Sequence, residues 1–302
     1  MPQKVIVNRF QAAVIGSMGM ADVLPDFLVQ QVFVAFDTET TGMWAPFNRI
    51  VEIGAAKFTL AGGEPATFQS LVNPERRIPE EVIAVHGITD DMVSGAPGIR
   101  PVLEEFASFC GPDSVLVAHN APFDISFVGD ELNRVGLEFG DNSILDTVDI
   151  YHRLFPGLAS YSLRNLIMHF GIARTQTHRA LDDAIMVQRL LVQAAPKLAG
   201  FASWDDFMAD FSVYHMGDWR SEIAILPEGF TDLQQAVTNG IKVEIEYQHP
   251  VKAAAMRVIH PRQVFKLGSV YYINAFCELA GGDRTFRLDR IASYRVLENQ
   301  SF

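Results

Sequence analysis

Cysteine is scarce in this 302-residue sequence, which contains only Cys110 and Cys277. Two cysteines cannot build the disulfide framework of a small secreted protein, so we expect a protein of the reducing cytoplasm. Long apolar runs are also missing, because no uncharged apolar stretch approaches the roughly 18 residues of a membrane span. These absences argue against a disulfide scaffold and against a membrane protein.

Basic residues are fewer than acidic ones in this sequence. The chain has 24 Lys and Arg against 36 Asp and Glu, a net charge of −12. From Ile241 to Phe302 there are nine basic and six acidic residues, a local +3, so the rest carries 15 against 30, or −15. An acidic total weakens long-range attraction to nucleic acid. It does not exclude a short groove lined by a few basic residues.

The composition fits a globular enzyme. Hydrophobic residues make up 49% of the chain, and 302 residues exceed one typical domain, so we expect two domains. The mildly apolar stretch Ala12 to Ala21 follows Lys4 and Arg9. It is compatible with an N-terminal helix, with a signal peptide, or with a start codon placed upstream of Met18 or Met20.

Two carboxylates follow an apolar run that predicts a buried strand. The run is Val32 to Phe36, and Asp37 and Glu39 come directly after it. Residues i and i+2 of a strand point to one face, so both carboxylates lie side by side. Like charges at this distance need compensation, and oxygen ligands suit magnesium or manganese. Asp124 and Asp183 could complete a site for two divalent cations.

A histidine stands before a predicted helix that starts near Arg179. Five helical residues turn through about 500°, so His178 would face away from Asp183 if it were helical. We therefore place His178 on a mobile loop just before the helix, where it can act as a general base. The ordinary pKa of histidine, about 6.5, suits this role at neutral pH. Asp182 competes with Asp183 as a ligand, but it also fits a first-turn acidic residue favoured by the helix dipole.

Periodicity predicts a mixed α/β layer fold. We expect a three-strand antiparallel meander from 32–37, 49–60 and 67–72, with a hairpin at Ala61-Gly62-Gly63. Further strands are expected at 115–118 and 144–145. Helices are expected at 125–135, 162–169 and 179–191.

Three segments carry a family resemblance. They are DTETTG at Asp37 to Gly42, HNAPFD at His119 to Asp124, and HRALDD at His178 to Asp183. In this order they resemble the DEDDh 3′-to-5′ exonucleases, the superfamily of polymerase proofreading subunits. Weaker landmarks are VHGIT at 85–89, LDT at 145–147 and YSLRNL at 161–166. The resemblance covers roughly residues 30–195.

The resemblance implies a ribonuclease-H-like mixed sheet with helices on both faces, and a role such as DNA repair. It also implies two Mg²⁺ or Mn²⁺ ions and a nucleic-acid substrate. By resemblance, the metal ligands are Asp37, Glu39, Asp124 and Asp183, and the general base is His178. Positions implied to contact substrate are Thr40, Thr41, Gly42, Met43, Ile88 and Asn120. From the residues alone, Met43 and Ile88 also fit surface or core packing, His119 fits a hydrogen bond within its turn, and His86 fits a structural role.

A second pattern begins after Pro196. Residues 204–211 and 219–226 are apolar and acidic and predict a helical connector. A helix at 230–239 closed by Gly240, and strands at 242–247, 258–265, 270–276 and 285–288, then predict a small β-rich module. It resembles the WYL domain, although the naming triplet reads Tyr271-Tyr272-Ile273 here. The expected domains are an extension at 1–30, the exonuclease at 31–197, the connector at 198–227 and the WYL module at 228–302.

WYL domains are associated with ligand sensing and nucleic-acid binding. Basic and aromatic residues could hold a single strand through phosphate contacts and base stacking. The candidates are Arg257, Tyr271, Arg284, Arg287 and Arg290, with Phe286 beside them. The arginines could instead pair with Asp283, Asp289 and Glu298.

The sequence favours a magnesium-dependent exonuclease acting on single-stranded nucleic acid, with a possible nucleotide ligand at the WYL module. Two alternatives stay open. One is a ligand-sensing regulator whose nuclease fold binds nucleic acid without cutting it. The other is an RNA-trimming enzyme with the same chemistry, since reading the 2′-hydroxyl depends on pocket geometry. Oligomeric state is not predicted.

Overall fold

The structure, a computed structural model, describes residues 23–216, 222–248, 254–267 and 269–297. The stretch Ala12 to Ala21 lies outside the described residues. The chain divides into two compact units, Met1–Asp218 and Trp219–Phe302. No described helix has both the length and the apolar character needed to cross a membrane.

The first unit is built on a six-stranded mixed sheet with the order β3-β2-β1-β4-β5-β6. Antiparallel pairs join β1, β2 and β3, whereas β4 and β5 run parallel to β1. The expected meander is therefore confirmed. The strands are β1 (Val32–Thr40), β2 (Ile50–Thr59), β3 (Ala66–Leu71), β4 (Val115–Ala118), β5 (Ile144–Asp146) and β6 (Val213–Tyr214).

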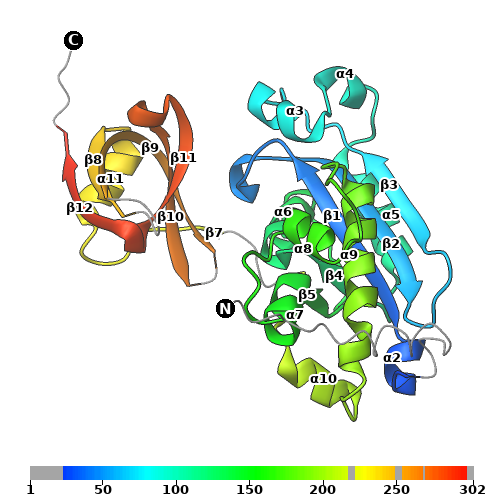
Figure 1. The fold of residues 1–302 in the computed structure, drawn as a ribbon. Coiled ribbons are helices and arrows are strands. Elements are labelled where there is room, and N and C mark those ends of the chain that lie inside the picture. The colour runs from blue at the N-terminus through cyan, green and yellow to red at the C-terminus, as the bar shows by residue number, and fades with distance from the viewer. Residues whose placement is uncertain (1–22, 217–221, 249–253, 268, 298–302) are drawn as a thin grey trace. The chain divides into compact units, whose positions relative to one another are not determined.

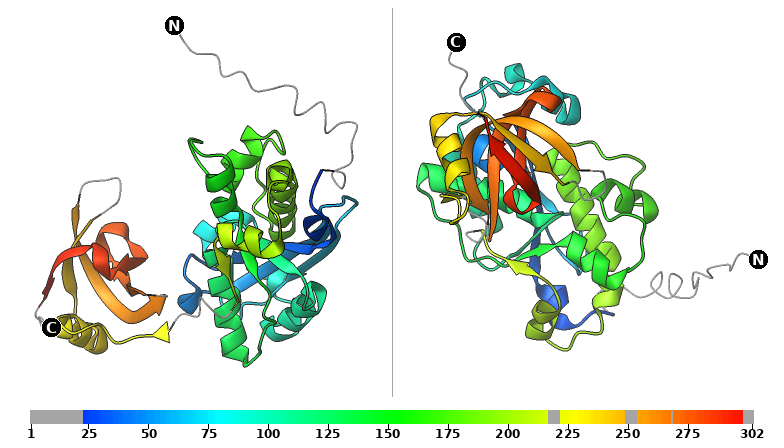
Figure 2. Two further views of the ribbon diagram at one scale, coloured as in Figure 1. Left: turned by 90° about the horizontal axis from the view of Figure 1, so that it is seen from below. Right: turned by 90° about the vertical axis from the view of Figure 1, so that its left-hand side faces the viewer.

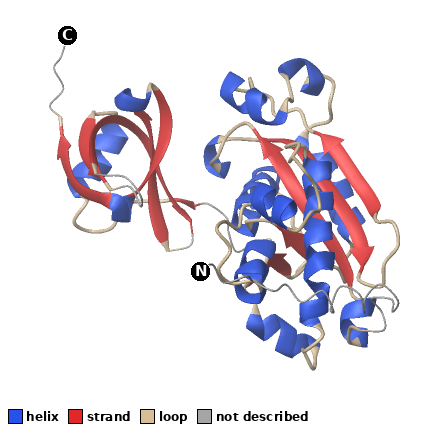
Figure 3. Ribbon diagram, in the orientation of Figure 1, coloured by secondary structure: helices blue, strands red, loops and turns tan. Residues whose placement is uncertain are grey.

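Helices cover both faces of this sheet (Figures 1 and 3). On one face α9 packs against β1 and β2, and its Val187 and Leu190 share a core with Phe33 and Ala35 of β1. On the other face Phe106 of α5 packs against Phe36. The helices of this unit are α2 (Asp26–Gln30), α3 (Glu80–His86), α4 (Asp90–Val93), α5 (Ile99–Cys110), α6 (Ala121–Val135), α7 (Thr147–Leu154), α8 (Leu163–His169), α9 (Ala180–Ala194) and α10 (Trp204–Asp210).

One helix starts earlier than its apolar periodicity predicts. The expected start at residue 125 is wrong, because α6 begins at Ala121 and contains Asp124 in its first turn. Pro122 lies at the start of this helix, where its missing N–H leaves no hydrogen bond unmade. Asp124 is thereby fixed on a helix and not on a loop.

The second unit is an antiparallel sheet with the order β11-β10-β9-β8-β12, and α11 packs against β9 and β12 (Figure 2). β7 pairs with β9 beside this path. Gly240 ends α11 in the left-handed conformation, as expected. The elements are β7 (Glu222–Ile223), α11 (Thr231–Asn239), β8 (Val243–Tyr247), β9 (Ala255–Leu267), β10 (Val270–Cys277), β11 (Gly282–Arg287) and β12 (Ile291–Val296).

Two expectations for this half of the chain need correction. The pattern predicts a helix over residues 219–226, but Glu222–Ile223 forms β7, because its backbone pairs with Lys266 and Phe265 of β9. Residues 219–221 lie outside the described part. The pattern also gave no sign of β12, an edge strand on which buried and exposed residues do not alternate cleanly.

Candidate active site

The carboxylates of β1 point to the face of the sheet that α9 covers. Phe33 and Ala35 belong to the same core cluster as residues of α9. Because every second residue of a strand points to the same face, the side chains of Asp37 and Glu39 point there too. Across the antiparallel pair, Asp37 lies opposite Gly54 and Glu39 lies opposite Glu52. Partners in such a pair point to the same face, so this end of the sheet is strongly acidic.

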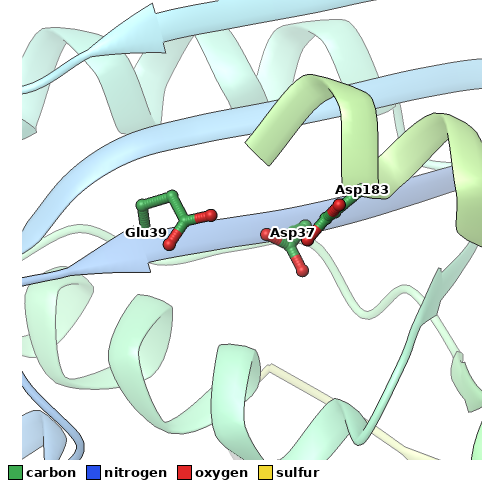
Figure 4. A group of neighbouring side chains, drawn as sticks. All are labelled: Asp37, Glu39 and Asp183. Atoms are coloured by element: carbon green, nitrogen blue, oxygen red, sulfur yellow. The ribbon is translucent and has the colours of Figure 1, made fainter. Parts of the chain in front are cut away.

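Helix α9 adds a third carboxylate to the pair. One oxygen each of Asp37, Glu39 and Asp183 lie within 4.8 Å of one another. Figure 4 shows the three side chains, with Asp37 and Glu39 on β1 and Asp183 on α9. Asp183 is buried, and its Oδ1 has no hydrogen-bond partner. Its Oδ2 accepts a hydrogen bond of 2.5 Å from the Gln176 side chain. A buried carboxylate that keeps one oxygen unpaired and lies beside two other carboxylates is an arrangement that a cation can complete.

The competing residue points elsewhere. Asp182 is exposed, and its Oδ2 accepts a hydrogen bond of 3.0 Å from the Thr177 hydroxyl. Its carboxylate therefore holds Thr177, in the loop before α9, at the first turn of the helix, where an acidic residue is favoured. Of the two candidates in HRALDD, the geometry favours Asp183 as the ligand.

Asp124 of α6 is held beside β1 by Thr38. It is buried in the first turn of α6, and its Oδ1 accepts hydrogen bonds from the Thr38 backbone N–H (2.8 Å) and the Thr38 hydroxyl (2.7 Å). Thr38 thus fixes the position of the Asp124 carboxylate through Oδ1. Asp124 lies outside the group of three, but its charge raises the pKa of Asp37.

The electrostatics of the site are those of crowded buried acids. Burial, together with the charges of Asp124, Glu39 and Asp183, raises the pKa of Asp37 well above its usual range. Burial and the Asp183 charge raise the pKa of Glu39 to about 8. Burial raises the pKa of Asp124 to about 7 in spite of the Thr38 hydrogen bonds, and it raises that of Asp183 as well. Such acids hold protons in the absence of cations, and a divalent cation would replace them.

The donor set fits magnesium or manganese. All four side chains offer oxygen, and among the described residues no histidine or cysteine joins the group of Asp37, Glu39 and Asp183. Hard cations of this kind prefer carboxylate oxygen, whereas zinc sites mostly use nitrogen and sulfur.

His178 stands outside the helix, one residue before Arg179, which caps α9. Its φ of 53° lies in the left-handed region, which a residue with a Cβ rarely adopts. Burial raises the pKa of Asp183 and His178 opposes this rise, so the imidazole lies within electrostatic range of the acidic cluster. The sequence predicts a mobile loop here, but hydrogen bonds from Thr177 to Asp182 and from Arg179 to Glu52 hold both neighbours of His178.

The second motif has a structural role around Asp124. The His119 ring and the Thr147 hydroxyl are 2.8 Å apart, and burial lowers the pKa of His119 to about 4. Asn120 has a φ of 63°, and its backbone N–H donates to Asp146 over 2.9 Å. Asp146 also accepts the Val148 N–H at 2.8 Å, so LDT joins the starts of α6 and α7.

The residues implied to contact substrate divide into two groups. Met43 is 69% exposed, whereas Ile88 is fully buried against Val51, Ile78 and Val93. Packing is thus the role that the structure favours for Ile88. His86 lies beside it as a structural residue, accepting the Ile88 N–H at 2.9 Å.

The turn after β1 uses its own side chains. The Thr40 hydroxyl donates to the Gly42 carbonyl over 2.6 Å, and the Thr41 hydroxyl accepts the Arg49 N–H at 3.0 Å. Gly42 lies so close to Asn48 that a Cβ would approach its Oδ1 to 2.5 Å. Thr40, Thr41 and Gly42 therefore shape the turn that presents Met43.

The basic residues of the second unit have mixed surroundings. Arg287 pairs with Asp289 through two hydrogen bonds of 3.0 and 2.7 Å. Lys266 lies over the Tyr271 ring at 5.7 Å, and the Arg257 Nε is buried without a partner. Arg284 is exposed and Arg290 is partly exposed, whereas Phe286 is core. The side chains of Asp283 and Glu298 lie outside the described part.

Sequence reasoning missed three residues that hold the site in place. Gln176 binds Asp183, and Glu52 binds Arg179 although 127 positions separate them. The one available signal was a glutamate inside the apolar strand VEIGA, where a charged side chain needs a buried partner.

Two regions of the sequence match known protein families. The profile of the family described as Exonuclease matches residues 34–191, and that of the WYL domain matches residues 228–296. The DNA polymerase III subunit epsilon of Treponema pallidum is 41% identical over 160 residues, which are 52% of this chain and 74% of that protein. DNA polymerase III PolC-type of Oceanobacillus iheyensis is 39% identical over 172 residues, 57% of this chain but only 12% of that protein.

A solved structure agrees in fold. The nuclease domain of 3′hExo, a DEDDh family member bound to rAMP, matches 61% of this chain and 96% of its own length. The TM-score is 0.51 and the identity is 16%, so the likeness is one of fold. The ribonuclease-H-like expectation is confirmed. Because the family profile spans slightly more than half of the sequence, this chain belongs to the DEDDh exonuclease family and carries a WYL domain after its nuclease domain.

Proposed function

We propose that this chain is a metal-dependent 3′-to-5′ exonuclease that releases 5′-mononucleotides from single-stranded nucleic acid, with DNA favoured. One observation carries the proposal: Asp37, Glu39 and Asp183 converge within 4.8 Å, and Asp183 leaves a buried oxygen without a partner. The relatives named as DNA polymerase III subunits support DNA as the substrate. A cytoplasmic location is part of the proposal.

The carboxylates divide between two proposed cation sites. Asp37, Glu39 and Asp183 would hold one Mg²⁺ or Mn²⁺, and Asp37 and Asp124 would hold the second. Such a pair of cations stabilises the attacking and the leaving oxygen of a phosphodiester. His178 accepts the proton of the attacking water, and Met43 at the exposed turn contacts the terminal base.

Labelled oligonucleotides test the proposal. The full chain would be given single-stranded DNA, duplex DNA and RNA, each labelled at one end, with and without Mg²⁺. Shortening from the 3′ end that needs Mg²⁺ supports the proposal, and the product size shows whether mononucleotides are released. A preference for RNA would favour the trimming enzyme. Tight binding without any cleavage would favour a regulator with a non-catalytic nuclease fold.

Stabilisation by Mn²⁺ should grow as the pH rises. The pKa of Glu39 is raised to about 8 and that of Asp124 to about 7. Between the unfolded value near 4.3 and these folded values, the folded chain holds protons that the unfolded chain has lost. The free energy of unfolding of the metal-free chain therefore falls through this range. Cations replace these protons, so a fixed Mn²⁺ concentration should raise the Tm more at pH 8 than at pH 6.

Two variants give this measurement its control. Glu39→Gln removes one of the shifted acids and should reduce the pH dependence of the Mn²⁺ effect. Glu105→Gln makes the same chemical change at an exposed position of α5 and should leave the pH dependence of the Mn²⁺ effect on Tm unchanged. An Mn²⁺ effect on Tm that is equal at both pH values would contradict the assignment of these acids to a cation site.

We further propose that the WYL unit binds nucleic acid or a nucleotide ligand. Its support is a set of basic and aromatic residues distributed over neighbouring strands, in which Arg257 has a buried Nε without a partner and Arg290 is partly exposed. Arg287 is partly neutralised by Asp289, so Arg257 and Arg290 are the better test positions.

Removing the second unit should affect long substrates most. A chain ending at Asp218 keeps every proposed catalytic residue and should still cut a short oligonucleotide. Its KM on long single strands should rise more than on short ones if the WYL unit holds substrate. Arg257→Ala and Arg290→Ala in the full chain should act in the same direction and reduce the salt dependence of binding. Equal KM values on long strands would leave a sensory or oligomerisation role instead.

A further inference from the structure

We propose that the buried Glu52 and the partly exposed Arg179 form a clamp that positions His178 and Asp183 together, which makes Glu52 a positioning residue for the reaction under Proposed function. Glu52 lies on β2 and is fully buried. Its carboxylate accepts hydrogen bonds from the Arg179 Nε (2.9 Å) and Nη2 (2.5 Å), from the Ala180 N–H (3.0 Å) and from the Gln69 side chain (2.9 Å).

The full set of donors gives Glu52 a different role from its neighbours. It lies opposite Glu39 on the adjacent strand, yet both of its oxygens are occupied, so it has none left for a cation. Burial alone would raise the pKa of Glu52, but the hydrogen bonds from Arg179, Ala180 and Gln69 hold it below its usual value. Glu52 therefore behaves as a fixed anion that receives the start of α9.

A glycine lets the helix come this close. Gly54 follows Glu52 by two residues and faces the same side of β2. A Cβ at Gly54 would lie 2.1 Å from the Leu181 nitrogen and 2.2 Å from the Ala180 carbonyl carbon. The backbone of the first turn of α9 therefore rests directly on β2, and Glu52 fixes where along the strand it rests.

The clamp lies between the two functional side chains. Arg179 follows His178 directly, and its carbonyl accepts the Asp183 N–H at 2.9 Å. On the far side of His178, Thr177 binds Asp182 and Gln176 binds Asp183. His178 is thereby held in a left-handed conformation, which persists only where the surroundings fix it. Loss of the clamp should disturb the imidazole and the Asp183 carboxylate together.

The test compares full-length variants with a matched ion pair. Glu52→Gln keeps the size of the side chain and removes its charge. Glu104→Gln makes the same change in the exposed Arg100–Glu104 pair of α5 and serves as the control. For each variant, Tm, the affinity of the metal-free chain for Mn²⁺ by titration calorimetry, and kcat and KM on a short single-stranded oligonucleotide would be measured.

We expect Glu52→Gln to lower kcat and Mn²⁺ affinity each by about 10- to 100-fold, the usual effect of residues that orient metal ligands. KM should change much less, because substrate contacts are not touched. Arg179→Met should be more damaging than Glu52→Gln, since it leaves a buried carboxylate unpaired beside Glu39. Adding Glu52→Gln to Arg179→Met should then restore part of the loss, because it removes that unpaired charge.

Each outcome decides the proposal. Mn²⁺ affinity and kcat equal to those of Glu104→Gln, with only a lower Tm, would show that the pair merely stabilises the fold. If Glu52→Gln does not fold, Arg179→Lys takes its place, since it keeps the charge but loses the two-pronged contact. Wild-type kcat and Mn²⁺ affinity in that variant would also overturn the clamp. If the wild type cleaves nothing, the proposed function fails, while the Mn²⁺ affinities still test the clamp.

Discussion

Asp37→Ala is expected to abolish cleavage while leaving the chain folded. Asp37 is the residue proposed to contact both cations, and the charges of Asp124, Glu39 and Asp183 all act on it. Losing several kcal/mol of transition-state stabilisation corresponds to a rate loss of about 10³-fold or more. The same change removes one charge from a repelling cluster, so the metal-free variant should unfold at a Tm equal to or above that of the wild type.

The controls separate loss of metal from loss of fold. Asp37→Asn keeps the shape of the side chain and should be as inactive as Asp37→Ala. The wild type should stop cutting in excess chelator and recover when Mg²⁺ or Mn²⁺ is added. Robust cleavage by either Asp37 variant, or by the wild type in excess chelator, would remove the two-cation proposal.

His178→Ala is expected to slow turnover by about 10²- to 10⁴-fold, the usual contribution of a general base. Mn²⁺ affinity and KM should stay close to those of the wild type, because His178 is not among the proposed ligands.

The left-handed backbone at His178 calls for a second variant. Alanine at a φ of 53° is strained, so a slow His178→Ala could reflect a displaced loop. Asparagine tolerates this conformation better but cannot act as the base. Equal losses in His178→Ala and His178→Asn would assign the effect to the missing imidazole. A rate within about tenfold of the wild type in either variant would make His178 a structural neighbour, since general bases contribute more.

Local patterns predicted the elements that carry the site. Alternation and the Gly62-Gly63 turn gave the meander, and an apolar run gave β4 with its observed ends. The first turn of α6 lies outside the predicted helix, although Pro122 suits a first turn. β7 was missed because tertiary pairing with β9 decides the state of two residues that local pattern does not.

The contacts that hold the site in place could not be predicted from local sequence patterns. The pairing of Glu52 with Arg179 joins a strand to a helix start far along the chain. Nothing in either local pattern names the other partner. Motif order indicated which carboxylates meet, whereas the hydrogen bonds from Thr38 and Gln176 that orient two of them became visible only with the fold.

Gly54 has a bearing on how related sequences are read. It carries no chemistry and belongs to none of the three motifs, yet a single added carbon would collide with the backbone of α9. A homologue with a larger residue at this place would have its helix lifted from the strand, with Asp183 carried away from Asp37. Such a chain could keep every acidic motif and still be inert. When active and inactive homologues are distinguished by sequence, the residue at the position of Gly54 should therefore be checked together with the carboxylates.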